Sequence, residues 1–167
     1  MKQERKGMST TTSKEKFSKI LVPIDGSEPS MDAADDAILM ARQYNADLIA
    51  VYVLPEKLRY EYADGIDSDV PITTSTRGII ELPRQEIEEK SFSKIKEKCK
   101  QNNVKLDTEV VITTKSLVAE IVDYAQSNNV DLIVVGTRGR SGFKKLLLGS
   151  IASGVVTYAH CPVMVVK

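Results

Sequence analysis

The sequence predicts an α/β protein built on a doubly wound sheet of five mostly parallel strands, with helices on both faces. Two observations support this fold class. Short apolar runs alternate with stretches in which apolar residues recur at helical spacing, in the order β-α-β-α-β-α-β-α-β. The chain of 167 residues also has the size of one domain, so its strands are expected to share one sheet. For a doubly wound sheet of this kind we take the order 3-2-1-4-5.

The first predicted unit is strand, helix, strand. Residues 20–24 (ILVPI) are a short apolar run ended by the turn signal Asp-Gly, which is typical of a strand buried on both faces. Pro23 lies near the carboxyl end of this strand, where the loss of one N–H matters less. A helix follows and stops at Asn45, and residues 48–54 form the second strand. Such a crossover is right-handed in nearly all proteins.

The rest of the chain repeats this alternation. Residues 55–82 carry no firm period and are predicted to be a long loop, either a functional lid or a variable insertion. The pattern at 106–112 alternates apolar and polar residues, which indicates a half-exposed edge strand. The remaining elements are a helix from Pro83 to the stop at Asn102-Asn103, that strand at 106–112, a helix over 117–127, a strand at 132–135, a helix over 150–159 and a strand at 163–166.

Composition excludes several classes of protein. Lys plus Arg and Asp plus Glu both number 23, so the chain lacks the basic excess of a nucleic-acid binder. With His160 as its single histidine, and with Cys99 and Cys161 far apart, neither a zinc site nor a disulfide is expected. No apolar run reaches membrane-spanning length and no signal sequence opens the chain, which favours the cytoplasm. Residues 1–16 are polar and predicted to be a disordered tail, ahead of one domain over 17–167.

A glycine-punctuated loop is the strongest candidate for chemistry. The buried strand 132–135 runs directly into Gly136, and Gly139 and Gly149 follow before a helix begins at Ser150. Each glycine alone fits an ordinary turn, but a strand, a glycine loop and a helix start in succession favour a phosphate cradle. In the order 3-2-1-4-5, Asp25 at the end of the first strand lies on the opposite side of this cradle. The signature GxxxxGK[ST] does not occur, nor does GxGxxG after the first strand.

The spacing of these glycines resembles a known family. Gly136-x2-Gly139-x9-Gly149-Ser150 is similar to the ATP-binding motif G-x2-G-x9-G-S/T of the universal stress proteins, and the segments KILVPIDGSEPS and CPVMVVK look like the start and end of that family's domain. The resemblance implies a Rossmann-like fold of the adenine nucleotide alpha hydrolase type. It also implies a homodimer formed through the last strand, Val163–Val166.

The resemblance further implies a set of nucleotide-binding residues. Asp25 would bind the ribose, Pro23 and Val53 would flank the adenine, and the loop residues would wrap the ribose and phosphates. Arg138 and Arg140 either pair with phosphate or face water. Ala152 stands where the family often has a hydroxyl residue that contacts phosphate. The full set is Pro23, Ile24, Asp25, Val53, Gly136, Thr137, Arg138, Gly139, Arg140, Gly149, Ser150, Ile151 and Ala152.

Three functions compete at this point. The first is a stress-response regulator that binds ATP, or ADP or AMP, with Mg²⁺ held through the phosphates and with slow or no hydrolysis. The second is a weak Mg-dependent ATPase or nucleotidyl-transferring enzyme that uses Asp25. The third is an interaction module whose site is empty or holds another ligand. The intact glycines argue against the third function, and Ala152 argues for it. The motif supplies no evident catalytic base, so any hydrolysis in the first is expected to be slow.

Overall fold

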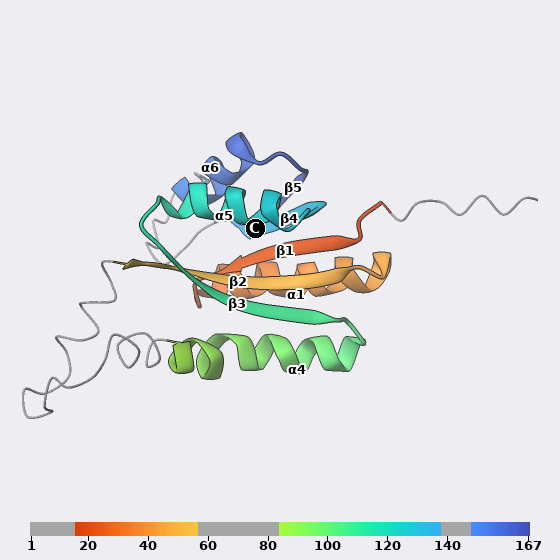
Figure 1. Cartoon of the computed structure of the whole chain (residues 1–167). Helices are drawn as coiled ribbons and strands as arrows, with labels where there is room; N and C mark the ends of the chain where they lie inside the picture. The colour runs from red at the N-terminus through yellow and green to blue at the C-terminus, as the bar shows by residue number, and fades with distance from the viewer. Residues whose placement is uncertain (1–15, 57–83, 138–147) are drawn as a thin grey trace, which may run out of the picture.

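The computed structural model describes residues 16–56, 84–137 and 148–167, and it contains the predicted sheet of five strands. The strand order is β3-β2-β1-β4-β5, and every neighbouring pair is parallel. The predicted fold class is therefore confirmed (Figure 1). The elements are β1 (Lys19–Ile24), α1 (Glu28–Tyr44), β2 (Asp47–Pro55), η1 (Glu88–Phe92), α4 (Ser93–Asn102), β3 (Leu106–Thr113), α5 (Leu117–Ser127), β4 (Leu132–Gly136), α6 (Ser150–Tyr158) and β5 (Val163–Val166).

Two predicted segments lie largely outside the described residues. The tail predicted over 1–16 is described only at Lys16, and the loop predicted over 55–82 only at residues 55 and 56. The two outer strands, β3 and β5, lie at the edges of the sheet, as the alternating pattern of 106–112 indicated for β3. In the order β3-β2-β1-β4-β5 the central strand is β1, and β3 and β5 come last on either side.

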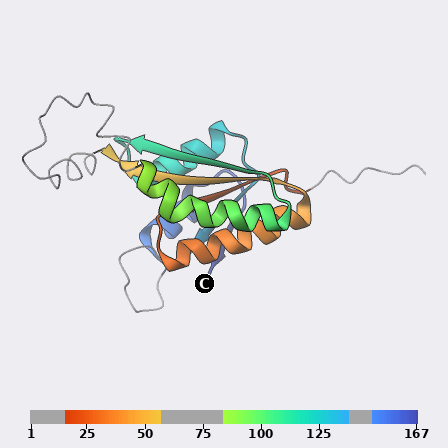
Figure 2. The ribbon, with the colours of Figure 1, turned by 90° about the horizontal axis from the view of Figure 1, so that it is seen from below.

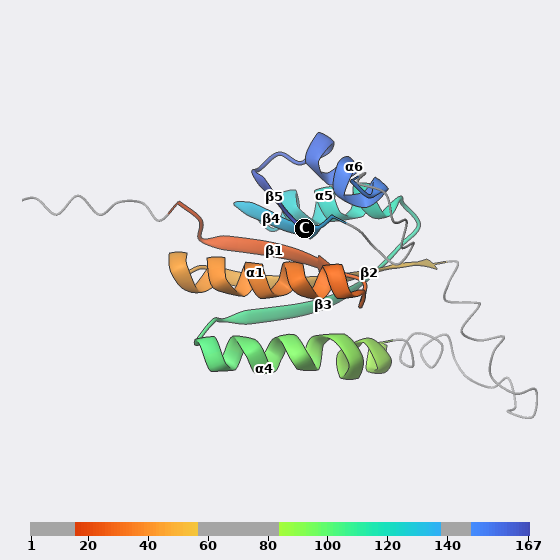
Figure 3. The same ribbon diagram turned by 180° about the vertical axis from the view of Figure 1, so that it is seen from behind.

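The helices form two layers, one on each face of the sheet. Helices α1 and α4 lie side by side on one face, and α5 and α6 pack together on the other (Figures 2 and 3). The core is divided accordingly into two clusters of buried side chains. One joins β1 and β2 to α1, η1 and α4, and it includes Phe92 and Ile95, both fully buried. The other joins β1, β2 and β4 to α5 and α6 through aliphatic residues such as Ile121, Ala125 and Val155.

Asparagines end the helices as predicted, for a local reason. Asn45 after α1 and Asn103 after α4 adopt the left-handed conformation, with φ of 51° and 55°. Asparagine tolerates this conformation better than most side chains. In each case the cap N–H bonds carbonyls of the last turn, so the chain leaves the helix and enters the next strand with its backbone groups satisfied.

The helix predicted from Pro83 contains a feature that its apolar pattern did not predict. Its first described residues lead into the π-turn η1, which precedes α4. The five-residue spacing of the buried Ile87 and Phe92 matches the i to i+5 repeat of such a turn. Ile95 and Cys99 then continue at α-helical spacing, so the π-turn aligns both halves on one buried face.

Pro23 shapes the centre of the sheet. The ladder between β1 and β2 continues to Ile24, whereas the described ladder between β1 and β4 ends at Leu21 and Ile133. The carbonyl of Lys19 accepts the N–H of Asp131 on the β4 side, so strand alternation points the nitrogen of Pro23 toward β4 as well. Because proline has no N–H to donate, the missing bond falls where β1 and β4 stop pairing.

Candidate functional site

The turn after β1 holds Asp25 in a fixed arrangement. Its Oδ1 accepts the backbone N–H of Ser27 at 3.0 Å and the Ser27 hydroxyl at 2.5 Å. Gly26 between them has φ of +79°, which requires glycine. The Ser30 hydroxyl accepts the Asp25 N–H at 3.4 Å and donates to the Ser27 carbonyl at 2.8 Å. The half-buried carboxylate therefore lies at the carboxyl end of β1 on a turn that the first residues of α1 brace.

Gly136 has a packing role that the sequence did not reveal. A Cβ at this position would lie 2.4 Å from the carbonyl oxygen of Pro29 and 2.8 Å from its carbonyl carbon. Glycine thus allows the end of β4 to lie against the first turn of α1. The first turn of α1, which follows the Asp25 turn, therefore lies directly against the end of β4.

The base of the glycine loop is closed by main-chain hydrogen bonds. The Thr137 N–H donates to the Val166 carbonyl at 2.7 Å, and the Thr137 carbonyl accepts the Gly149 N–H at 2.8 Å. Arg138, Gly139 and Arg140 lie outside the described residues. The residues that bound them are therefore brought together, with the start of α6 held beside the end of β4.

The first turn of α6 offers uncapped backbone donors. Its N-cap is Gly149, which makes no side-chain cap, whereas Ser116 caps α5 by accepting the Ala119 N–H. The amides of the first turn of a helix have no partner within the helix, and a helix N-terminus attracts negative charge. The hydroxyl-bearing Ser150 is exposed at this turn. The arrangement suits an anionic group such as phosphate.

The remaining predicted residues divide between the two faces of the sheet. Val53 and Ile151 are half-buried and pack against the cluster under α5 and α6. Ala152 is 3% exposed within that cluster, so its side chain belongs to the core. Ile24, also 3% exposed, points into the opposite cluster, while Pro23 remains half-buried. Ile24 can offer a ligand only its backbone.

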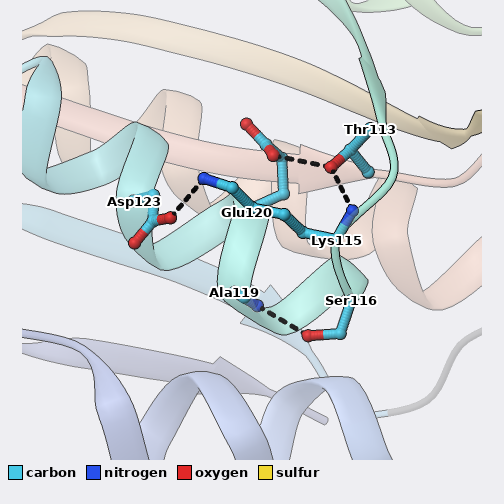
Figure 4. A network of polar contacts seen from close by, with 6 residues as sticks. All are labelled: Thr113, Lys115, Ser116, Ala119, Glu120 and Asp123. Carbon is cyan, nitrogen blue, oxygen red and sulfur yellow. Dashed lines mark hydrogen bonds and ion pairs between the residues drawn. The ribbon is translucent and has the colours of Figure 1, made fainter.

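The sequence analysis missed a pocket at the end of β3. It has a volume of about 290 Å³ and is lined by Glu56, Ile112, Thr113, Thr114, Lys115 and Glu120. Thr113 is 5% exposed, and its hydroxyl joins β3 to α5 through Glu120 (Figure 4). The signal in the sequence is the polar run Thr113-Thr114-Lys115-Ser116 between strand 106–112 and the next helix. The hydrogen bond to Asp123 also raises the pKa of the Lys115 ammonium.

Comparison with known proteins settles the family. The family model described as "Universal stress protein family" matches residues 16–167. The chain belongs to the universal stress protein family. Universal stress proteins of Methanocaldococcus jannaschii and Bacillus subtilis are 36% and 33% identical to it. Each alignment covers 90% of this chain, together with 82% of the first protein and 99% of the second.

Solved structures of universal stress proteins share the fold. One from Lactobacillus plantarum has a TM-score of 0.66 at 26% identity, over 90% of this chain and 98% of its own. A universal stress protein in complex with cAMP has a TM-score of 0.59 at 23% identity, over 90% and 97% of the two chains. One from Archaeoglobus fulgidus in complex with dAMP has a TM-score of 0.62 at 22% identity, over 90% and 98%. None of the helices described in this universal stress protein is long and apolar enough to cross a bilayer.

Proposed function

We propose that this protein is a cytoplasmic, homodimeric stress-response regulator that binds an adenine nucleotide where β1 and β4 end, with slow or no hydrolysis. The observation that carries the proposal is the uncapped N-terminus of α6, held beside the end of β4 by the Thr137–Gly149 hydrogen bond. Adenine nucleotides named with two structural neighbours, cAMP and dAMP, support the choice of base.

Each part of the nucleotide has a counterpart in the chain. The amides of Ser150, Ile151 and Ala152, with the loop from Gly136 to Arg140, bind the phosphates. Asp25 accepts from the ribose hydroxyls, and Pro23 and Val53 flank the base. Mg²⁺ would bind through the phosphates and neutralise part of their charge. Residues from both sides of the site are needed, so the site forms only in the folded chain.

The Asp25 carboxylate is suited to hold the ribose rather than to activate water. Its Oδ1 is already engaged by two donors of Ser27, which stabilise the charged form and fix its direction. The motif residues include no evident general base that could activate water. The bound nucleotide is therefore expected to persist as a regulatory ligand.

The test of nucleotide binding is calorimetry together with thermal denaturation. ATP at 100 times its dissociation constant stabilises a folded protein by about 2.7 kcal/mol. Asp25→Asn keeps an acceptor for Ser27 but removes the charge, and it should reduce this stabilisation strongly. Asp35→Asn alters an exposed carboxylate that pairs with Lys98, and it should leave the stabilisation intact. Equal ATP responses in both variants would refute the assignment of Asp25.

The edge strand β5 supports the proposed homodimer. Its four residues are apolar, and three of them are only half-buried. The Val166 carbonyl bonds Thr137 of β4, so alternation turns the N–H of Val165 away from the sheet. An outward edge of this kind is a template for pairing with a second copy.

Light scattering during size-exclusion chromatography tests the dimer. Val165→Pro removes an outward N–H but no hydrogen bond to β4, so it should yield a folded monomer. Val165→Thr is the matched control and should remain dimeric. A monomeric wild-type protein at micromolar concentration would contradict the proposal.

A further inference from the structure

A buried hydroxyl lies against the turn that holds Asp25. Ser91 on η1 is 6% exposed, and a Cβ added to Gly26 would lie 3.3 Å from its hydroxyl oxygen. Among the described residues this hydroxyl makes no hydrogen bond. Buried side-chain hydroxyls nearly always have a partner, and one that lacks a partner lowers the stability of the fold. A serine at this position therefore indicates a role other than packing.

The π-turn η1 brings Ser91 to the Asp25 turn. It contains two successive buried residues, Ser91 and Phe92. Phe92 belongs to the core under α1 and α4, whereas the Ser91 oxygen lies against Gly26. Single π-turns inside α-helices are frequent at functional sites. The structure thus adds to the surroundings of Asp25 a residue from a distant part of the sequence.

The main chain of Gly26 can supply the missing partner. Neither its N–H nor its carbonyl makes a hydrogen bond within the part of the chain that the structure describes. Its φ is +79°, and glycine adopts positive and negative φ about equally readily, so its peptide groups can rotate. The preceding N–H, that of Asp25, reaches the Ser30 hydroxyl at 3.4 Å, beyond the usual range of about 2.7–3.2 Å. The main chain around Gly26 is therefore the least anchored part of this turn.

We propose that Ser91 is a positioning residue of the nucleotide site, whose hydroxyl forms a hydrogen bond with the main chain of Gly26 when a ribose hydroxyl binds the Asp25 carboxylate. This inference rests on the proposed nucleotide binding. Gly26 lies between Asp25 and Ser27, which are joined by a side-chain hydrogen bond, so a ligand that shifts the carboxylate also shifts Gly26. The bond to Ser91 stabilises the bound form of the turn, while the cost of an unpaired hydroxyl falls on the unbound form.

The experiment measures ATP binding by calorimetry, and thermal unfolding without nucleotide, in the same variants. Ser91→Ala removes a hydroxyl that has no partner in the unbound form, so its melting temperature without nucleotide should equal or exceed that of the wild-type protein. ATP should bind to this variant about tenfold more weakly, which corresponds to about 1.4 kcal/mol. A residue that only supported the fold would lower both the melting temperature and the affinity.

Two further variants separate the hydrogen bond from the volume of the side chain. Ser91→Cys fills the site but replaces the hydroxyl with a thiol, which hydrogen-bonds only weakly, so it should bind ATP as weakly as Ser91→Ala does. Ser93→Ala is the matched control on the next turn. It removes an exposed hydroxyl that donates to the Glu89 carbonyl at 2.5 Å, and it should keep the wild-type affinity for ATP.

The outcomes distinguish this inference from the proposed function. If Ser91→Ala or Ser91→Cys binds ATP as tightly as the wild-type protein, the hydroxyl has no positioning role while nucleotide binding stands. A lower melting temperature of Ser91→Ala without nucleotide, or an equal loss of affinity in Ser93→Ala, would also overturn the inference in favour of a structural role. If the wild-type protein does not bind ATP, the proposed function fails and this inference falls with it.

Discussion

The two faces of the sheet differ in what they bury and in what they carry. The face under α1 and α4 buries large side chains, among them Phe92 and Ile95, neither with any exposed surface. The cluster under α5 and α6 is less extensive and has no aromatic ring among its buried residues, and α6 leaves Val156 and Tyr158 exposed at 48% and 70%. The predicted residues Val53, Ile151 and Ala152 belong to this second face, under α5 and α6.

The difference teaches that stability and binding draw on different layers. Hydrophobic stabilisation grows with the apolar area removed from water, so the face with the more extensive buried cluster, under α1 and α4, contributes more. The face under α5 and α6 carries the candidate contacts to base and phosphate. The Asp25 turn is the exception, because it is braced by α1 from the first face. The following changes test this division, beginning with the largest expected effect.

Truncating a large side chain in the cluster under α1 and α4 should lower the free energy of unfolding most. Phe92→Ala is expected to lower the free energy of unfolding by about 3–5 kcal/mol, because a large buried ring is lost and a cavity remains. Val155 lies under α5 and α6 and is equally buried. Val155→Ala removes two methyl groups and should lower the free energy of unfolding by about 2 kcal/mol. Denaturation with urea measures both. A larger loss in Val155→Ala would reverse the assignment of the faces.

High pH should destabilise the fold through Cys99, which is buried in the cluster under α1 and α4. Burial raises the pKa of this thiol from 9.0 to about 11. The unfolded chain therefore loses the proton first as the pH rises, and stability falls between these two values. The loss should approach about 2–3 kcal/mol, at 1.36 kcal/mol per pKa unit. Unfolding of wild-type protein and Cys99→Ala at pH 8–10.5 isolates this contribution, which should be absent in the variant; parallel pH profiles would contradict it.

Two glycines compare the rigidity of the two faces. In Gly136→Ala the new Cβ meets the Pro29 backbone, which has no room to rotate away, and the cost should be about 1–3 kcal/mol. In Gly154→Ala the Cβ meets only methyl groups of Val118, at 2.7 and 2.8 Å. A gain of about 1 kcal/mol in helix propensity offsets that contact. Thermal unfolding measures the stability of both variants. An equal loss of stability in the two would show that the packing of α5 and α6 adjusts to an added Cβ no more easily than the packing of α1 does.

The smallest expected effect concerns the hydroxyls that brace the Asp25 turn. Ser91 on η1 is 6% exposed, and its hydroxyl oxygen lies 3.3 Å from where a Cβ on Gly26 would stand. Among the described residues this hydroxyl has no hydrogen bond, so Ser91→Ala should be neutral or stabilise by up to about 1 kcal/mol. Ser30 is equally buried but makes two bonds, so Ser30→Ala should destabilise by about 1 kcal/mol. Melting temperatures that fall together would remove the distinction.

The order of elements was predictable from the sequence because it depends on local patterns. Apolar periods mark strands and helices, and Asn45 and Asn103 end their helices through a left-handed conformation that asparagine tolerates. The strand order was taken from the usual arrangement of doubly wound parallel sheets, and the structure has the same order.

Other features were not predictable because they depend on distances between segments far apart in the chain. Gly136 is required by Pro29, more than one hundred residues earlier, and the pocket needs Thr113 and Glu120 to meet across β3 and α5. The π-turn at η1 reflects packing of Phe92 under the sheet, which a helical period of 3.6 does not express. For the candidate site, the sequence identified both sides and missed what joins them.

Pro23 has a mechanical consequence. Because β1 and β4 pair only over their first residues, few hydrogen bonds join the half of the sheet formed by β3, β2 and β1 to the half formed by β4 and β5. The helices strap the two halves together, with α1 packed on β1 and β4 and α5 reaching back to β2. Under pulling force or in amide exchange, this seam is where the sheet should part first. The sheet is thus most easily deformed between β1 and β4, where the proposed ligand would bind.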